Sequence, residues 1–537
     1  MITRRGFLRG GSSLALGAAA FPNIGRSAEQ AVASKPGQKP RRIIHIVSDG
    51  MSAGTLTCAD HLSEMLRGRG LTWLALHNHP GARTGWMNTR SLNSLVTDSS
   101  AAASTWGSGV RIINGVVNQA GDGTPLKTLY ELLGESGWQR GLVTTTEITH
   151  ATPAGFVACV KNREMATTIA RQYLERKVEV LLGGGQKYFD PKHRLDGRDL
   201  QAEFAAAGYA VMEDKSQLEK APTGQRWLGL FSRSHLPYTL DQAGDVKLQA
   251  KVPTLAAMTA AALRRLEGAS KFILQIEGGR VDHACHNNDA PAALHDQIAL
   301  DEAIDVCVAF QKREPDTLIV MTTDHGNGNL GLNGTGDGYG QSTWKFRNLK
   351  GVKSSFAKML RPLKRKPGEE PEEKEKDEEA DKAKEKAKSA AEKERDRIKK
   401  KKEEENVATP TEIIEIVGEG TGYQMPYRKA ELLRTYLANV GESLYDMRKA
   451  DVCALGDVLA NHLSIGFTGN AHTGDHVPVL ALGPGAEHFA GYIQNTDIFG
   501  HYLDFAGLDF RNPQEPLITP GGPESAAVEN ISSYRYS

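Results

Sequence analysis

Short apolar runs alternate with longer amphipathic stretches along most of the chain. The first run ends at Asp49-Gly50, which is typical of a buried strand that ends in a turn. The runs lie at 43–47, 142–145, 178–182, 272–279, 317–326 and 477–485. Helical patterns lie between them, for example at 254–266 and 293–311. Strands that alternate with helices predict a mostly parallel sheet with helices on both faces, and hence a large α/β domain with insertions.

Acidic residues stand where three of these predicted strands end. Asp49 follows the run 43–47, Glu277 closes the run "FILQIE", and Asp324 follows "TLIVMTT". In an open α/β sheet, ligands bind beyond the carboxyl ends of the strands. We therefore expect these three carboxylates to belong to one site.

The stretch "SLVTDSSAAASTWGSG", residues 94–109, places an acid and two serines before a run of alanines. The alanines predict a helix that begins at about Ser99. Asp and Ser are frequent helix N-caps, so a capping role explains the pair by itself. A helix N-terminus also binds anions, and a serine placed there can attack a bound phosphate. This stretch alone leaves both interpretations open.

Charge is balanced over the 537 residues, with 65 Lys and Arg against 65 Asp and Glu, so no nucleic-acid ligand is expected. Residues 364–405 differ from the rest because nearly every position is Lys, Arg, Asp, Glu or Ala, and Ile398 is the one large apolar side chain. Such a segment cannot bury a core. We interpret it as a low-complexity insertion in a loop, an inert spacer rather than a docking surface.

The chain begins "MITRRGFLRGGSSLALGAAAF", with Arg4 and Arg5 ahead of a weakly apolar run. That run is too short and too rich in Gly and Ala to span a bilayer. It predicts a twin-arginine signal within 1–33, whose partner is the twin-arginine export machinery; an ordinary secretory signal is the alternative. Cleavage after Ala20, Ala28 or Ala33 is left open. The expected location is the periplasm or the exterior. Five scattered cysteines give no disulfide framework.

Three further segments carry residues that ligate metals. They are "EGGRVDHACHNND", "TTDHGNGN" and "GNAHTGDHVPV". Imidazoles and carboxylates without thiolates suit zinc in a catalytic site better than in a structural one. On a helix, Asp282 and His286 are four residues apart and share one face. Each fragment alone is weak evidence, but several such pairs after predicted strands reinforce one another.

These motifs together resemble the alkaline phosphatase family. The matching pieces run in family order from about residue 43 to residue 503: "SDGM", "VTDSSAAAST", "HATPAGFVACVKNR", "VPTLAAMT", "EGGRVDHACH", "TTDHG" and "HTG". The resemblance implies an alkaline-phosphatase-like α/β fold, split into catalytic parts at 41–345 and 410–510, with a C-terminal tail at 511–537. It also implies a metal-dependent phosphomonoesterase with two Zn²⁺ and one Mg²⁺. Because the family is commonly dimeric, a homodimer is expected.

The resemblance assigns a role to individual positions. Ser99 corresponds to the nucleophile that becomes phosphorylated, Arg163 to the residue that binds the phosphate oxygens, and Asp98 to the neighbour that holds this arginine. By this resemblance the first zinc is bound by Asp282, His286 and His472, and the second by Asp49, Asp324 and His325. Magnesium falls to Asp49, Thr152 and Glu277. His150 and His283 stand where some relatives have Asp and Lys, so we expect them behind the ligands rather than among them.

Elementary chemistry agrees with these roles. A serine hydroxyl is a poor nucleophile until it is activated, and a metal lowers the pKa of a bound hydroxyl. A guanidinium matches two phosphate oxygens at once. Related hydrolases of diesters or sulfate esters are alternatives, but "DSSAAAS" lacks the Pro and Arg of a sulfatase motif. A phosphate-binding protein without turnover is a further alternative, although such a protein is expected to have lost Ser99 or a ligand.

Overall fold

The computed structural model describes residues 38–334, 339–364, 407–438 and 450–514. The predicted signal at 1–33 lies outside the described residues. So do the charged insertion beyond Lys364 and most of the predicted tail at 511–537. The predictions for these segments therefore stay predictions.

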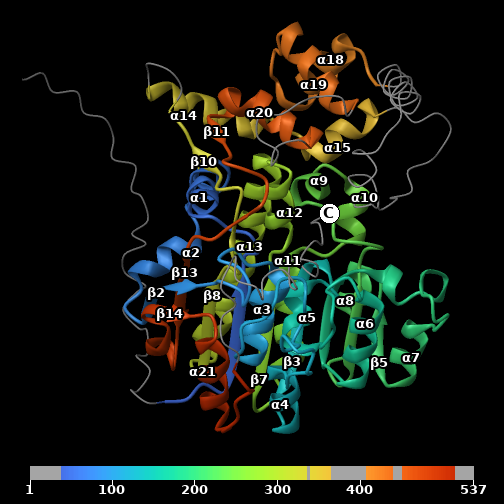
Figure 1. Cartoon of the computed structure of the whole chain (residues 1–537), viewed down its shortest axis with the longest axis vertical. Coiled ribbons are helices and arrows are strands. Elements are labelled where there is room, and N and C mark those ends of the chain that lie inside the picture. The colour runs from blue at the N-terminus through green and yellow to red at the C-terminus, as the bar shows by residue number, and fades with distance from the viewer. Residues whose placement is uncertain (1–37, 335–338, 365–406, 439–449, 515–537) are drawn as a thin grey trace, which may run out of the picture.

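A ten-stranded sheet runs through the molecule in the order β14-β2-β13-β8-β1-β7-β3-β4-β6-β5 (Figure 1). All six predicted strands belong to it. The strands are β1 (Arg42–Val47), β2 (Ala82–Asn88), β3 (Gln139–Glu147), β4 (Val180–Gly184), β5 (Tyr209–Met212), β6 (Arg226–Leu230), β7 (Phe272–Glu277), β8 (Thr317–Thr322), β13 (Val477–Leu482) and β14 (Gly491–Gln494).

Neighbouring strands of this sheet are parallel except around β13. That strand pairs antiparallel with both β8 and β2, whereas β14 returns to run parallel to β2. The predicted mostly parallel sheet is therefore confirmed in its coarse form as a mixed sheet with one reversed strand. The central strands β8, β1 and β7 are in register, since Val47 lies opposite Thr322 on one side and Glu277 on the other.

Helices cover both faces of the sheet, because its central strands are apolar on both sides. In β1, Ile44 and Ile46 belong to one buried cluster, while Ile43 and Val47 belong to the other. The first cluster includes side chains of α1 (Ala53–Arg67), α11 (Leu255–Leu266) and α13 (Ala290–Arg313). The second includes side chains of α4 (Leu129–Glu135), α6 (Ala166–Glu175), α7 (Leu200–Ala206) and α21 (Asp497–Ala506). The helices predicted at 254–266 and 293–311 are confirmed as α11 and α13.

A group of helices gathers at the top of Figure 1, where the chain on both sides of the charged insertion returns to the first cluster. Lys364 and Val407 form an antiparallel bridge, so the chain leaves and re-enters at one place. The helices are α14 (Gly340–Phe346), α15 (Phe356–Leu360), α18 (Pro410–Thr421), α19 (Tyr427–Leu437) and α20 (Asp451–Leu463).

Small residues let α3 (Ser99–Ser108) pack closely on α5 (Ala151–Val157). A Cβ on Gly107 would lie 1.9 Å from the carbonyl oxygen of Gly155, and a Cβ on Gly155 would lie 2.6 Å from Ala103. The run of alanines in α3 therefore serves close packing of two backbones. This contact fixes Ser99, at the start of α3, relative to Thr152 in α5.

The remaining helices are α2 (Thr72–Ala75), α8 (Lys215–Glu219), α9 (Thr239–Ala243), α10 (Val246–Lys251) and α12 (Arg280–His286). Short strands pair as β9 (Gly326–Asn327) with β12 (His472–Thr473), and β10 (Gly331–Leu332) with β11 (Ile465–Gly466). None of the described helices combines the length and apolar character needed to cross a membrane. All five cysteines lie in described segments, and none of them forms a disulfide.

Candidate metal centre and active site

The three acidic residues that follow predicted strands meet at one edge of the sheet. Asp49, Glu277 and Asp324 are all fully buried, and they follow or end β1, β7 and β8, which are adjacent in the sheet. Glycine at position 50 makes the turn after β1: its φ is +70°, and a Cβ there would lie 2.5 Å from Oδ1 of Asp282. The "SDGM" turn thus brings a fourth carboxylate to Asp49.

Burial raises the pKa of Asp49 well above its usual range, and the nearby charges of Asp324, Asp282 and Glu277 raise it further. Oδ1 of Asp49 and Oε1 of Glu277 are buried and have no hydrogen-bond partner among the described residues. Carboxylates this close together in the interior require a cation to stay ionised. The donor set therefore fits bound metal ions.

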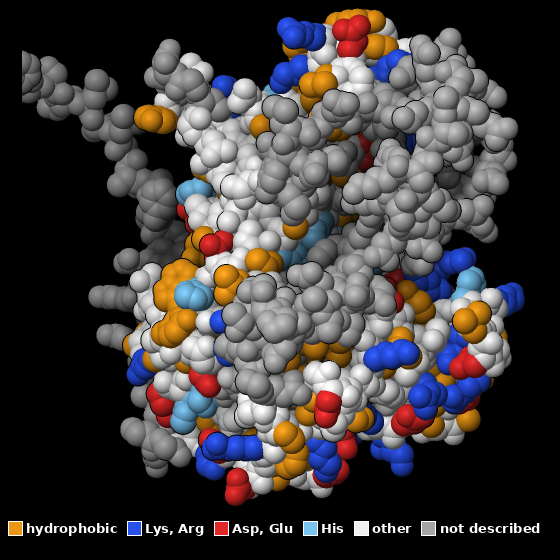
Figure 2. Space-filling view, in the orientation of Figure 1, with side chains coloured by type: hydrophobic (Ala, Val, Ile, Leu, Met, Phe, Trp, Pro, Cys, Tyr) orange, Lys and Arg blue, Asp and Glu red, His pale blue; other side chains and the backbone are white. Residues whose placement is uncertain are grey.

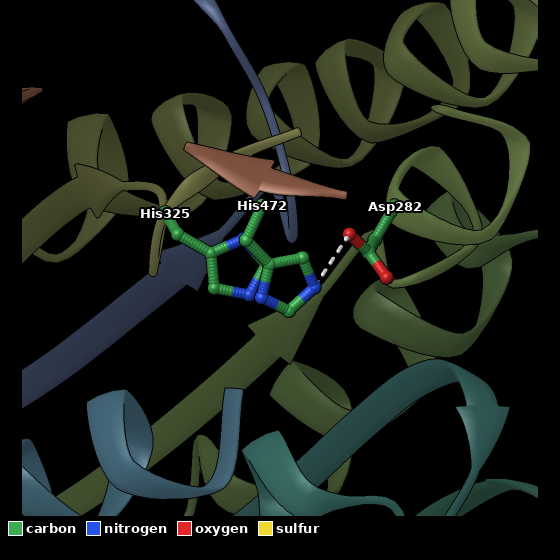
Figure 3. A group of neighbouring side chains, drawn as sticks. All are labelled: Asp282, His325 and His472. Carbon is green, nitrogen blue, oxygen red and sulfur yellow. Dashed lines mark ion pairs between the residues drawn. The ribbon is translucent and has the colours of Figure 1, made fainter. Parts of the chain in front are cut away.

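Two histidines lie against the carboxylate of Asp282, which is on α12 and so is one helical turn from His286. His286 Nε2 lies 3.3 Å from Oδ2 of Asp282 and 3.0 Å from Nε2 of His472. His472 Nε2 lies 3.6 Å from Oδ1 of Asp282. Figure 3 shows this carboxylate opposite the rings of His472 and His325, which stack with their centres 3.5 Å apart. The ligands that the resemblance gives to the first zinc are thus neighbours.

Electrostatics in this group favour an ionised Asp282 and a neutral His472. Burial acts to raise the pKa of Asp282, but the imidazoles of His286, His472 and His325 outweigh it and hold that pKa well below its usual range. Burial and the nearby His325 lower the pKa of His472 well below its usual range. These are the protonation states in which carboxylate and imidazole ligate a metal.

His325 joins this group to a second one. Its Nε2 lies 3.1 Å from Oδ2 of Asp324 and 3.7 Å from Oδ1 of Asp49. Among the described residues, three sets of side chains bring one ligand atom each to a common point, and all members are buried except the partly buried His150. The sets are Asp282, His325 and His472; Asp49, Asp324 and His325; and Asp49, His150 and Glu277. The second is the set expected to hold the second zinc, and the first has His325 in the place expected for His286.

Hydroxyls surround the third set. Thr152 Oγ1 lies 3.5 Å from Oδ2 of Asp49, as the resemblance implies. Thr144 and Thr146, both in β3, donate to Oε2 of Glu277. These two threonines were missed from the sequence; the only signal was the repeated Thr in "LVTTTE". His150, expected behind the ligands, is part of the set and places Nδ1 3.5 Å from Oε1 of Glu277.

Ser99 lies beside the metal-ligating side chains. It is the first residue of α3, it is buried, and its Oγ is 3.2 Å from Nε2 of His325. The N-cap of α3 is Asp98, whose Oδ1 accepts from the backbone N–H of Ala101 at 2.8 Å. The capping interpretation of this pair is therefore confirmed for Asp98, whose carboxylate caps the first turn, and the hydroxyl of Ser99 is left for the site.

Arg163 reaches the same place from the loop after α5. Its Nη1 donates to Oδ2 of Asp98 at 3.2 Å, and its Nη2 donates to Nε2 of His150 at 3.1 Å. Oδ2 of Asp98 also accepts from Ser100 and from the backbone N–H of Gly115. A guanidinium held at both ends in this way is aimed by its neighbours before any ligand binds.

His235 was not foreseen and lies in the middle of the histidines. Its ring centre is 4.4 Å from that of His283 and 5.9 Å from that of His150. Burial lowers the pKa of His235 and of His283 well below the usual range. Nothing in "SRSHLPY" marks His235, because it joins the others only through the fold. Figure 2 shows histidine side chains in a hollow of this face, below the upper helices.

The fold and these side chains define an α/β protein with a buried centre of carboxylates and imidazoles beside a helix-initial serine. The family described as alkaline phosphatase matches residues 40–508, and the chain therefore belongs to the alkaline phosphatase family. It is a phosphoric monoester hydrolase. Alkaline phosphatase 3 of Bacillus subtilis is 28% identical over 91% of this chain and 93% of its own. The alkaline phosphatase of Schizosaccharomyces pombe is 28% identical over 92% and 87%.

Solved structures give the same result. The crystal structure of Thermus thermophilus alkaline phosphatase is 32% identical, covers 93% of this chain and 97% of its own, and superposes with a TM-score of 0.78. The cold-active alkaline phosphatase of a Shewanella species shares the fold, with 24% identity over 86% and 99% of the two chains and a TM-score of 0.65.

Proposed function

We propose that this protein hydrolyses phosphate monoesters to alcohol and inorganic phosphate through a phosphoserine at Ser99. The observation that carries the proposal is the position of the Ser99 hydroxyl. Its Oγ is buried at the start of α3 and lies 3.2 Å from Nε2 of His325. The backbone N–H groups of the first turn add positive potential where a phosphate would sit. The residue before Ser99 is Asp98, which holds Arg163, so adjacent residues position the nucleophile and the phosphate-binding side chain.

The proposed metals are two Zn²⁺ and one Mg²⁺. Asp282, His286 and His472 would hold the first zinc, Asp49, Asp324 and His325 the second, and Asp49, Thr152 and Glu277 the magnesium. When bound, such ions lower the pKa of a hydroxyl and neutralise the charge of a transferred phosphoryl group. A mutant of TAB5 alkaline phosphatase has magnesium bound in a site called M3. The unpartnered oxygens of Asp49 and Glu277 support a cation in this chain.

The protein's own groups then divide the work. The hydroxyl of Ser99 attacks phosphorus in line with the leaving oxygen. The bond from phosphorus to that oxygen breaks as the phosphoserine forms, and the proton of the hydroxyl ends on the leaving oxygen, which departs as the alcohol. Arg163 holds two non-bridging oxygens and keeps that geometry, while Asp98 and His150 hold Arg163. Water then cleaves the phosphoserine and restores the hydroxyl of Ser99. A phosphate with free terminal oxygens suits Arg163, and this favours monoesters over diesters.

Export by the twin-arginine pathway, a periplasmic or secreted location and a homodimer complete the proposal. The support for export is the Arg4-Arg5 segment of the sequence, and the support for a dimer is membership of the family. Blocking the twin-arginine pathway is expected to keep the protein in the cytoplasm. Normal export under that block would contradict this part of the proposal.

The direct test is hydrolysis of a chromogenic phosphomonoester at alkaline pH by the purified protein. We expect activity that a chelator removes and that zinc with magnesium restores, and we expect little activity from Ser99→Ala under any of these conditions. A wild-type protein shown to contain its metals, yet inactive on monoesters, would contradict the proposal and would direct the assay to diesters and sulfate esters.

A further inference from the structure

Arg280 carries a positive charge at the edge of the site without a carboxylate partner. It is the first residue of α12, and its guanidinium lies over the ring of Tyr238, 3.9 Å from the ring centre. Its Nη1 donates to Nδ1 of His283 at 2.7 Å. Within the described part of the chain Arg280 makes no ion pair, although its charge acts to lower the pKa of the buried Asp296, and its buried Nε has no hydrogen-bond partner.

The histidines beside Arg280 are fixed as hydrogen-bond donors. An arginine side chain can only donate hydrogen bonds, so Nδ1 of His283 accepts from Arg280 and carries no hydrogen. In the neutral ring the hydrogen is therefore on Nε2. The backbone N–H of Glu147 donates to Nδ1 of His235 at 3.1 Å, which fixes the same tautomer there. Lys187, the other nearby cation, is already paired with Glu147 at 2.9 Å. Arg280 is therefore the cation that remains for a ligand.

A continuous line of side chains joins Arg280 to the arginine proposed to bind the reacting phosphate. Arg163 donates to His150, and the ring centre of His150 is 5.5 Å from that of His283. His283 in turn accepts a hydrogen bond from Arg280. The ring of His235 packs against both of these histidines. A guanidinium thus stands at each end of a row of imidazoles, and the one at Arg280 forms no ion pair with any described carboxylate.

We propose that Arg280, beside His235 and His283, forms a second anion-binding subsite. The preferred substrates are then phosphate monoesters whose leaving group carries a second phosphate. A guanidinium binds two oxygens of such a group at once. This inference rests on the proposed phosphatase function and names the substrate class at the same site.

The test compares matched esters that differ only in the second phosphate. Monophosphates and bisphosphates of straight-chain diols with two to six carbons are assayed with the full-length, metal-loaded protein. At the best spacing we expect the bisphosphate to have about tenfold higher kcat/KM, after correction for its two equivalent ends. In Arg280→Met, which keeps the aliphatic stem over Tyr238, this ratio is expected to fall to about one. Arg280→Lys, which keeps the charge, is expected to retain part of it.

Arg313→Met is the matched control, because Arg313 also lies over an aromatic ring, that of Phe310, but at the far end of α13. It is expected to keep the ratio of the wild type. A ratio that is the same in the wild type and in Arg280→Met would overturn the inference while leaving the phosphatase function intact. Hydrolysis of neither ester by the wild type would instead contradict the proposed function.

A binding measurement tests the subsite independently of the phosphatase function, because it needs no turnover. Calorimetry compares propylphosphonate with propane-1,3-bisphosphonate, which cannot be hydrolysed. Tighter binding of the bisphosphonate by the wild type, lost in Arg280→Met, supports the subsite. Equal dissociation constants for the two phosphonates in the wild type would overturn it.

Discussion

The hydroxyl of Ser99 lies 3.2 Å from Nε2 of His325, and both side chains are buried. His325 belongs to two of the three candidate metal-ligating sets found among the described residues. Ser99 therefore lies beside the residue that these two sets share. We expect Ser99→Ala to lower kcat by about a thousandfold or more, because removing a nucleophile leaves only binding and electrostatic effects. Steady-state hydrolysis of a chromogenic monoester measures this.

Ser108→Ala is the matched control for that variant. Ser108 is a buried serine at the other end of the same helix, and its Oγ donates to the carbonyl oxygen of Ser104 at 2.8 Å. It is expected to keep kcat within about threefold, because it touches none of the ligand sets. An equal loss in both variants would mean that α3 had been disturbed and that Ser99 had no special role.

Arg163 is expected to act mainly on phosphate binding. Its guanidinium is held by Asp98 and His150 at 3.2 Å and 3.1 Å. Arg163→Met removes two charge-assisted hydrogen bonds to the ligand, and we expect the inhibition constant for inorganic phosphate to rise about 10- to 100-fold. Arg171→Met, on the exposed face of α6, is the control and should leave that constant unchanged. A similar constant in wild type and Arg163→Met would exclude the proposed contact.

Removal of metal is expected to destabilise the fold as well as to abolish activity. Asp49, Glu277 and Asp324 are fully buried and close together, so without cations they repel one another or must take up protons. Ions present at a thousand times their dissociation constant stabilise by about 4 kcal/mol each. Calorimetry with and without a chelator measures the fall in Tm. An unchanged Tm after verified loss of metal would show that these residues do not hold it.

We expect His150 to set the metal preference of the candidate third site, which Asp49, His150 and Glu277 form. His150 brings an imidazole to Asp49 and Glu277, where a carboxylate would suit magnesium better, because Mg²⁺ prefers oxygen ligands. We expect His150→Asp to tighten magnesium binding and to lower the magnesium concentration that gives half-maximal activation. If the activation curve does not move, the ion in this site does not contact residue 150.

Asp296 provides a test of pH-dependent stability away from the metals. Burial raises its pKa to about 7, and its carboxylate accepts from the backbone N–H and the hydroxyl of Thr239. Between the unfolded value near 3.8 and the folded value near 7, the native state binds more protons, so this group's contribution to stability falls as the pH rises. Above about pH 7 the full cost of a buried charge is present.

Asp296→Asn keeps both contacts to Thr239 and removes that charge. Its free energy of unfolding is expected to match the wild type near pH 4 and to exceed it by about 2–4 kcal/mol at about pH 8. Denaturant unfolding at both pH values measures the difference. Asp504→Asn, at an exposed position of α21, should show no such gain. A gain that does not grow with pH would contradict the assignment of a raised pKa.

Much of the fold was predictable because its central strands are continuous apolar runs. Strands β1, β7 and β8 are buried on both faces, and their carboxyl ends carry the acids that the sequence marks. Strand β2, by contrast, has mostly exposed and partly buried residues near the sheet edge, and its "ARTGWMN" carries no such run. The reversed direction of β13 was not predictable either, because an apolar strand reads alike in both directions.

The site residues that lie in short sequence motifs were predictable from the sequence. Those that join the site only through tertiary contacts were not. Asp282 and His286 are recognisable by helical spacing, and Asp324 and His325 by their place after a strand. His235 is a single histidine in a loop, and only the packing of that loop on α12 brings it to His283. Arg280 stands inside a recognised motif, yet its lack of an ion pair within the described residues appears only in the structure.

The most direct test of the central claim is to trap the phosphorylated residue. The metal-loaded protein is mixed with a phosphomonoester, quenched in acid within milliseconds to seconds, digested, and analysed by mass spectrometry. Phosphate is predicted on the peptide that contains Ser99, to be absent in Ser99→Ala and to be absent after chelation. Rapid turnover with phosphate found on another residue, or on none, would contradict the account.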